Sequence, residues 1–190
     1  GLGPGDTRIT TRYRDDGFFA PVPVLDAEEV RRCRSDLEAF EAQTGNPLDF
    51  PEKSKSYLLF SWADRLVHHP KILDAVEDVI GPDILCYHST TWIKEPHTPA
   101  HVLWHQDGTY FFLDPHEHVT AWVALSDCSE RAGCMRVLPG SHELGQLAHT
   151  DHPGRWNMIK RGQGIVGRFD GEDGVTMPLR AGEMSLHHTD

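Results

Sequence analysis

The spacing of the hydrophobic residues changes at Gly81-Pro82. Before this pair, apolar side chains recur every three to four residues, as on one face of a helix, whereas from Ile84 onward they alternate with polar ones. Alternation of this kind buries one face of a β-sheet. No β-α-β alternation follows, so the sheets are expected to be antiparallel.

Two helices are expected before Gly81. Asp26 and Glu29 have the spacing of a capping box, and a helical stripe of apolar residues follows them at Val30, Cys33, Leu37 and Phe40. The second helix begins at Pro70, a residue type favoured at the first helical position. Its inward-facing residues are Ile72, Leu73, Val76, Val79 and Ile80.

Short strands bounded by Gly, Pro or Asp are expected in the rest of the chain. They cover residues 84–93, 102–111, 119–125, 134–138, 165–169 and 182–187. The pattern predicts a mainly β chain with flanking helices, folded as a double-stranded β-helix, the jelly roll of cupin-like proteins. With 190 residues, 38% of them hydrophobic, residues 1–190 are expected to form a single domain.

One of these expected strands contains the sequence His105-Gln106-Asp107, with apolar residues on both sides. Residues two apart leave the same face of a strand, so the imidazole and the carboxylate are expected to lie side by side. A histidine and a carboxylate are two of the three ligands that hold non-haem Fe(II) with open coordination positions. The alternative is a buried histidine that is hydrogen-bonded to its neighbour.

The His-x-Asp pattern is weak by itself, because the chain has 13 histidines and 29 acidic residues. It recurs at residues 149–151 and 188–190. Only the copy at His105 and Asp107 lies between two apolar runs. These two residues are therefore the candidate metal ligands and the candidate catalytic pair.

The strand expected over residues 119–125 places one large aromatic side chain, Trp122, among small neighbours on its face. The other residues of that face are Thr120 and Ala124. A tryptophan in this position either forms the wall of a cavity or fills core volume, and the pattern leaves both interpretations open.

The formal net charge of −11 argues against nucleic-acid binding, which needs a clustered excess of Lys and Arg. No apolar run approaches the roughly 18 residues that span a bilayer. We therefore expect a soluble, cytoplasmic protein with neither a nucleic-acid nor a membrane partner.

Three segments in this order make the chain resemble the phytanoyl-CoA dioxygenase family. They are His105 to Asp107, the strand at 120–125, and the block at 132–142 that contains a Pro-Gly-Ser turn. The likeness extends from about Gly17 to the last residue. Members of this family are oxygenases that depend on Fe(II) and 2-oxoglutarate. The resemblance therefore implies Fe(II) as cofactor, 2-oxoglutarate as cosubstrate, and O2 and a small organic molecule as the other substrates.

The resemblance also implies roles for single residues. His105 and Asp107 become the first two iron ligands, and Trp122 lines the 2-oxoglutarate pocket. Lys55 matches a family lysine near the cosubstrate, with a solvated surface lysine as the alternative. Related halogenases have a small residue where this chain has Asp107, so the carboxylate implies hydroxylation or another oxidation of a C–H bond, with release of succinate and CO2.

In the family, the third iron ligand is a histidine that follows the segment 187–188, and an arginine further on binds the far carboxylate of 2-oxoglutarate. We expect both residues beyond Asp190, so the oxygenase domain is expected to lack its C-terminal end. His187 and His188 are then neighbours of the third ligand.

Two other functions fit parts of the sequence. A jelly-roll protein could bind a metal or a ligand without turnover. A zinc hydrolase could use two histidines and one carboxylate, but it leaves the strand around Trp122 and the block at 132–142 without a role. An iron-dependent oxygenase of a small organic molecule is therefore the leading hypothesis.

Overall fold

The computed structural model describes residues 5–167, 169 and 173–190. Its three-stranded sheet has the order β1-β7-β2, with antiparallel pairing throughout. These strands are β1 (Phe18–Pro23), β7 (Glu183–His188) and β2 (Val119–Val123). Strands from the two ends of the sequence therefore lie side by side. Two further antiparallel pairs join β3 (Met135–Val137) to β6 (Val175–Met177) and β4 (His149–Asp151) to β5 (Gln163–Ile165).

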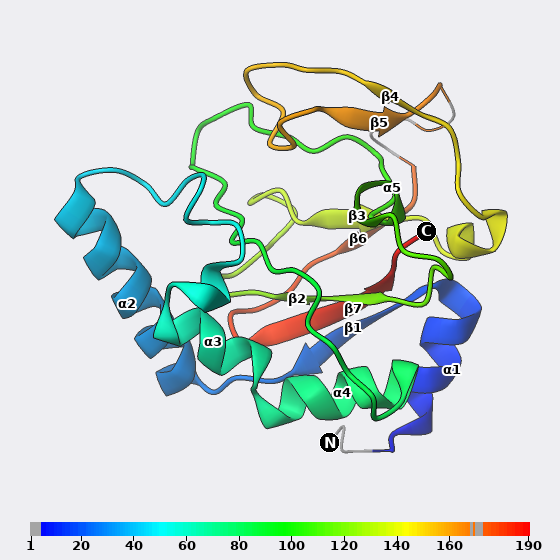
Figure 1. Cartoon of the computed structure of the whole chain (residues 1–190), viewed down its shortest axis with the longest axis horizontal. Helices are drawn as coiled ribbons and strands as arrows, with labels where there is room; N and C mark the ends of the chain where they lie inside the picture. The colour runs from blue at the N-terminus through cyan, green and yellow to red at the C-terminus, as the bar shows by residue number, and fades with distance from the viewer. Residues whose placement is uncertain (1–4, 168, 170–172) are drawn as a thin grey trace.

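Helices surround one end of this arrangement. The described helices are α1 (Thr7–Asp16), α2 (Ala27–Thr44), α3 (Ser61–Val67), α4 (Pro70–Ile80) and α5 (Gly108–Phe111), with short 3-10 helices at η1 (Ser56–Leu58) and η2 (Ser141–Leu144). Helices α1 to α4 lie toward one end of the molecule, and the β4–β5 pair lies at the other (Figure 1). The short helix α5 lies between the β4–β5 pair and the three-stranded sheet.

The main core lies between this sheet and helices α1 and α4. Met184 and Leu186 of β7 are fully buried there, with Ile9 of α1 and Val76 of α4 among their cluster. Successive residues of a strand point to opposite faces. Ser185 and His187 therefore belong to the other face of β7, away from the helices.

The positions of the two predicted helices are confirmed, but Ile80, expected to face inward, is exposed. The carboxylate of Asp26 accepts hydrogen bonds from the N–H groups of Glu28 and Glu29, and the Glu29 side chain accepts from Asp26 N–H. These contacts satisfy backbone donors that the first helical turn leaves free. Helix α4 begins at Pro70 and ends at Ile80, before Gly81. Helices α1 and α3 were not predicted.

The strand predictions are confirmed only in part. The expectations at 119–125, 134–138 and 182–187 correspond to β2, β3 and β7. The expectation at 165–169 is not confirmed, because β5 ends at Ile165, residues 166–167 form a bend, and Arg168 lies outside the described residues. Strands β1, β4 and β6 were not predicted. The strand expected at 84–93 is wrong, because that segment is irregular apart from one bridge between Thr90 and Ser54.

The strand expected at 102–111 is also wrong. Residues 108–111 form α5. Asp107, the residue before this helix, already has helical backbone angles (φ −61°, ψ −35°) and so is not part of a strand. Four of the seven described strands have only three residues, and helices hold more of the described chain than strands do. A mainly β chain is therefore not confirmed, whereas antiparallel sheets with flanking helices are.

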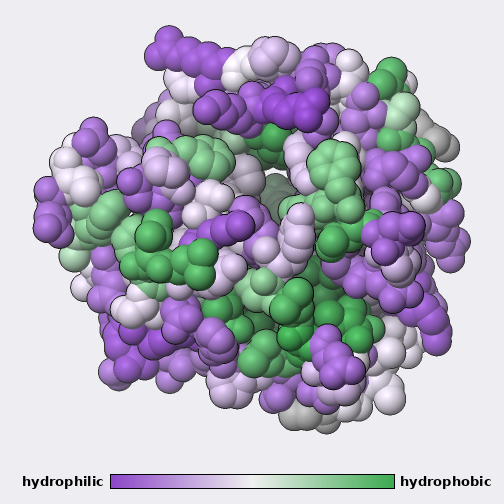
Figure 2. Space-filling model, viewed as in Figure 1, coloured by the Kyte–Doolittle hydropathy of each residue, from purple (hydrophilic) through white to green (hydrophobic). Residues whose placement is uncertain are grey.

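Apolar side chains gather on the face of the molecule that Figure 2 shows. On the face shown in Figure 2, hydrophobic residues collect in the lower centre, around α4 and the chain beside it, and hydrophilic residues surround them. Large exposed side chains of this part of the sequence are Ile80, Leu85 and Tyr87. Within the described ranges, no helix is both long and apolar enough to cross a membrane.

Replacing Leu186 with alanine should lower the free energy of unfolding by about 2–5 kcal/mol, because the fully buried side chain would leave a cavity. The matched control is Leu85→Ala, whose leucine is 85% exposed and which should change stability by no more than about 0.5 kcal/mol. Urea denaturation measures both variants. Equal losses would contradict the position of Leu186 in the core.

Candidate active site

His105 and Asp107 face one another, although not through the geometry of a strand. His105 Nε2 lies 3.2 Å from Asp107 Oδ1. His105 Nδ1 lies 2.8 Å from the carbonyl of Leu103, which can only accept a hydrogen bond, so Nδ1 carries a proton. In the neutral ring Nε2 then presents a lone pair to the carboxylate. Two electron-rich atoms in contact need a cation between them, either a proton or a metal ion.

The second oxygen of Asp107 is held by the three-stranded sheet. The hydroxyl of Thr120 on β2 donates to Asp107 Oδ2 at 2.7 Å, and His187 Nε2 on β7 lies 3.4 Å from the same oxygen. Thr120 and His187 are directly paired across β2 and β7. The carboxylate therefore joins the loop that carries His105 to the face of the sheet that points away from the helices.

The electrostatics of the pair follow from these contacts. Burial raises the pKa of Asp107, but the hydrogen bonds and charges of His105 and His187 outweigh it and hold this pKa well below its usual range. Burial lowers the pKa of His105, but Asp107 and the Leu103 carbonyl outweigh it and raise this pKa. Both shifts have the same origin, because the carboxylate and the imidazole each stabilise the charged form of the other.

Gln106, between the two candidate ligands, anchors their loop. Its backbone N–H donates to His149 Nε2 at 3.0 Å, and His149 Nδ1 donates to the Leu147 carbonyl at 2.9 Å, which fixes the tautomer of that ring. The Gln106 side chain is buried. Its amide N–H donates to the Gly145 carbonyl at 2.9 Å, and its Oε1 accepts from Leu147 N–H at 2.7 Å. Side-chain hydrogen bonds to His149 of β4, and to Gly145 and Leu147 just before β4, thus hold this loop in place.

A close approach of two backbone segments fixes the other end of this loop. Gly108 N–H donates to the carbonyl of Thr189 at 2.9 Å. A Cβ atom at position 108 would lie 3.0 Å from Asp190 Oδ1, 3.1 Å from Thr189 Oγ1 and 3.3 Å from His116 Nδ1. Glycine at this position therefore lets α5 begin directly beside the end of β7.

The donor chemistry of His105 and Asp107 fits a divalent metal ion. An imidazole Nε2 lone pair and an ionised carboxylate oxygen converge, and 24% and 20% of the two side chains are exposed, so an ion can reach them. In the part of the chain that the structure describes, no group of three or more His, Cys, Asp or Glu side chains could hold a metal ion. The described residues therefore provide two ligands of an iron site.

The other predicted site residues occupy different surroundings. Trp122 is on the same face of β2 as Thr120, paired with Ser185 of β7, and is half-buried. Lys55 is exposed in a left-handed turn before η1, and its N–H donates to the Ser89 carbonyl at 2.7 Å. No contact of Lys55 with His105 or Asp107 is found within the described residues. The structure thus brings together the two candidate ligands, with Trp122 further along the same sheet face.

The two histidines near the C-terminus point to opposite faces of the sheet. His187 faces Asp107, whereas the ring of His188 lies 6.2 Å from that of Tyr13 on α1 and 5.3 Å from that of His142. Alternation along β7 accounts for this difference. Of the two, only His187 belongs to the surroundings of the candidate metal site.

Three residues of this site were not predicted, namely Thr120, Gln106 and His149, and His187 was expected only as a neighbour of the third ligand. A sequence signal pointed to His149, because this residue begins the second His-x-Asp copy. In the structure, His149 accepts a hydrogen bond from Gln106 and so holds the loop of the first copy, His105 to Asp107. Thr120 and His187 meet Asp107 through the register of β2 and β7, which no local pattern reveals.

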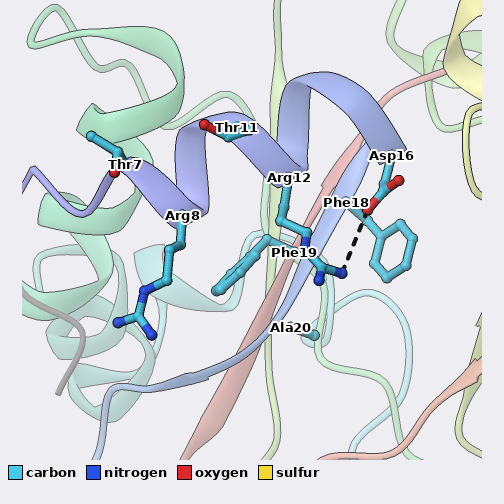
Figure 3. Close-up of a pocket in the computed structure, with 8 residues that line it drawn as sticks. All are labelled: Thr7, Arg8, Thr11, Arg12, Asp16, Phe18, Phe19 and Ala20. Carbon is cyan, nitrogen blue, oxygen red and sulfur yellow. Dashed lines mark ion pairs between the residues drawn. The ribbon is translucent and has the colours of Figure 1, made fainter.

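A surface hollow of about 560 Å³ lies elsewhere, between α1 and β1. Figure 3 shows its lining, with the guanidinium of Arg12 paired to Asp16 at 3.8 Å; the other lining residues are Thr7, Arg8, Thr11, Phe18, Phe19 and Ala20. None of them belongs to the loop of His105 and Asp107. The hollow is therefore separate from the candidate site.

Comparisons with known proteins identify the family of this chain. Residues 13–190 match the family described as phytanoyl-CoA dioxygenase. The human peroxisomal phytanoyl-CoA dioxygenase is 33% identical over 209 residues, which cover 93% of this chain and 59% of the human protein. The chain thus spans less than two thirds of that relative.

Solved structures show the same relationship. A non-haem monooxygenase, ThoJ, superposes with a TM-score of 0.77 at 35% identity, over 95% of this chain and 68% of ThoJ. The epimerase SnoN, solved with Fe³⁺, α-ketoglutarate and a nogalamycin compound, has a TM-score of 0.67 at 25% identity, over 96% of this chain and 73% of SnoN.

The fold and these likenesses define the class as non-haem iron oxygenases that depend on 2-oxoglutarate. Within this class, the chain belongs to the phytanoyl-CoA dioxygenase family. The family expected from the sequence is therefore confirmed.

Replacing His149 with phenylalanine keeps an aromatic ring but leaves Gln106 N–H without its acceptor. We expect the free energy of unfolding to fall by about 1–3 kcal/mol, the usual cost of an unsatisfied buried donor. His101→Phe is the matched control, because that exposed ring is hydrogen-bonded to the carbonyl of Pro99, two residues away. Equal stability of the two variants would show that His149 does not anchor the loop.

Proposed function

We propose that the full-length protein is an Fe(II)- and 2-oxoglutarate-dependent dioxygenase that hydroxylates, or otherwise oxidises, a C–H bond of a small organic molecule and releases succinate and CO2. The observation that carries this proposal is the contact of His105 Nε2 with Asp107 Oδ1 at 3.2 Å, on a loop fixed to the sheet. His105 and Asp107 would each give the metal one ligand atom. Family membership supports the same assignment.

The chain's own contribution is placement. Iron and 2-oxoglutarate, when bound, supply the oxidising chemistry that amino-acid side chains lack. Asp107 provides negative charge and His105 a neutral nitrogen, while Gln106 and His149 hold the loop that carries both. A carboxylate at position 107 also occupies the position that a halide would need, which favours oxidation of a C–H bond over halogenation.

We propose that Trp122 lines the 2-oxoglutarate pocket. Support comes from its position on the sheet face that carries Thr120 and His187, both in contact with Asp107. We propose from the family resemblance that Lys55 lies near the cosubstrate; its side chain is exposed, and its backbone N–H is bonded to the Ser89 carbonyl. We further propose that the antiparallel sheets belong to a double-stranded β-helix, as expected from the sequence.

The alternative function, a protein that binds metal or ligand without turnover, is not favoured. The similar proteins with known names include a dioxygenase, a monooxygenase and an epimerase, all of them enzymes. The ionised Asp107 beside a histidine lone pair also provides the ligand types that catalytic non-haem iron needs.

Asp107→Ala in the full-length protein should abolish 2-oxoglutarate-dependent succinate formation, because one metal ligand is removed. Circular dichroism should show an intact fold. Asp151→Ala is the matched control: it removes the carboxylate of the second His-x-Asp copy, which is ion-paired with Arg161 at the surface, and should retain activity. The assay is run with and without chloride, because the shortened side chain opens a position for a halide. Full activity of the Asp107 variant would refute the assignment.

Trp122→Phe keeps most of the apolar volume, so its stability should change by less than about 1.5 kcal/mol. A pocket role predicts a higher KM for 2-oxoglutarate with an unchanged melting temperature. The control is Trp92→Phe, whose exposed ring packs beside Lys53 and should leave that KM unchanged. Lost stability with an unchanged KM would instead show that Trp122 fills the core.

A further inference from the structure

The hydroxyl of Thr120 makes the two oxygens of Asp107 different. It donates to Oδ2 at 2.7 Å, the shortest of the contacts described for this carboxylate. Oδ1 faces His105 Nε2 at 3.2 Å, an atom without a proton in the neutral ring because Nδ1 holds it. The Thr120 hydroxyl therefore donates to Oδ2, whereas Oδ1 faces the Nε2 lone pair of the neutral His105 ring.

The position of Thr120 is rigid. Its backbone lies in β2 and is paired with His187 of β7, so the strand fixes the direction in which the side chain leaves. Threonine is branched at Cβ, and its χ1 angle is restricted by the strand backbone. The side chains of Thr120 and Asp107 are both partly buried, so water competes weakly for the contact. The strand and the branched side chain thus direct the hydroxyl at Oδ2.

A carboxylate can bind a metal ion through one oxygen or through both. Binding through both would use an additional coordination position and would draw Oδ2 away from its donor. Hydrogen bonds to the ligating groups commonly orient the ligands of a metal, and their loss typically weakens metal binding about 10–100-fold.

We propose that Thr120 is a positioning residue that commits Asp107 to bind the metal through Oδ1 alone. This inference rests on the proposed function, since it assumes a metal ion at His105 and Asp107. With Oδ2 occupied by the hydroxyl, Asp107 would offer the metal one oxygen, Oδ1, beside His105 Nε2. The metal would then keep open positions for further ligands, as non-haem iron chemistry requires.

The test compares Thr120→Val with Thr120→Ser in the full-length protein. Valine keeps the branched shape and suits a strand but removes the donor, whereas serine keeps the donor. Anaerobic calorimetry with Co(II), a redox-stable stand-in for Fe(II), measures metal affinity. We expect Thr120→Val to weaken Co(II) binding about 10-fold or more. Thr120→Ser should restore most of the affinity, and the melting temperatures of both metal-free variants should match that of the unmodified protein.

A control variant separates this effect from the general loss of a threonine hydroxyl. Thr150→Val makes the same change at an exposed position of β4 and should bind Co(II) like the unmodified protein. Equal Co(II) affinity of Thr120→Val and the unmodified protein would overturn the positioning role and leave the proposed function intact. So would weak binding by Thr120→Ser equal to that of Thr120→Val. Absence of Co(II) binding in the unmodified protein would overturn both.

Discussion

The charge of Asp107 is the constraint on which the arrangement of the site depends. A carboxylate removed from water is costly unless charged or hydrogen-bonding partners compensate it. Here the partners come from three parts of the sequence: His105 from the same loop, Thr120 from β2 and His187 from β7. Satisfying one charge therefore fixes the loop against the sheet. The same contacts leave an imidazole and a carboxylate oxygen directed at one point.

The parts of the fold that depend on local chemistry could be predicted from the sequence. A capping box, an N-terminal proline and a following glycine define the bounds of α2 and α4, because each acts within one turn of its helix. Core-facing and site-facing residues alternate along strands β2 and β7, because one face of the sheet packs on helices and the other faces the site. The segments at 84–93 and 102–111 look similar by hydrophobicity, yet their backbone groups make isolated contacts, such as that of the Trp104 carbonyl with Ile165 N–H and that of Gln106 N–H with His149, and no continuous strand ladder.

The candidate site was predicted less completely, for a physical reason. His105 and Asp107 stand out because apolar residues flank them, although their proximity comes from a turn of the loop and not from a shared strand face. Thr120 and His187 reach Asp107 only through the register of two strands far apart in the sequence. His149 resembled a competing ligand by pattern, but the carbonyl of Leu147 fixes its ring as a hydrogen-bond acceptor for Gln106.

The order of strands in the main sheet also bears on when this protein can fold during synthesis. In the described part of the chain, β1 and β2 pair only with β7, whose residues leave the ribosome long after theirs. Helix α2 and its capping box can form early, but the core between the sheet and helices α1 and α4 must wait for Met184 and Leu186. Until then, the apolar faces of α1, α4, β1 and β2 stay uncovered. The nascent chain should therefore expose apolar surface until β7 emerges, and such surface makes partly folded chains prone to aggregate.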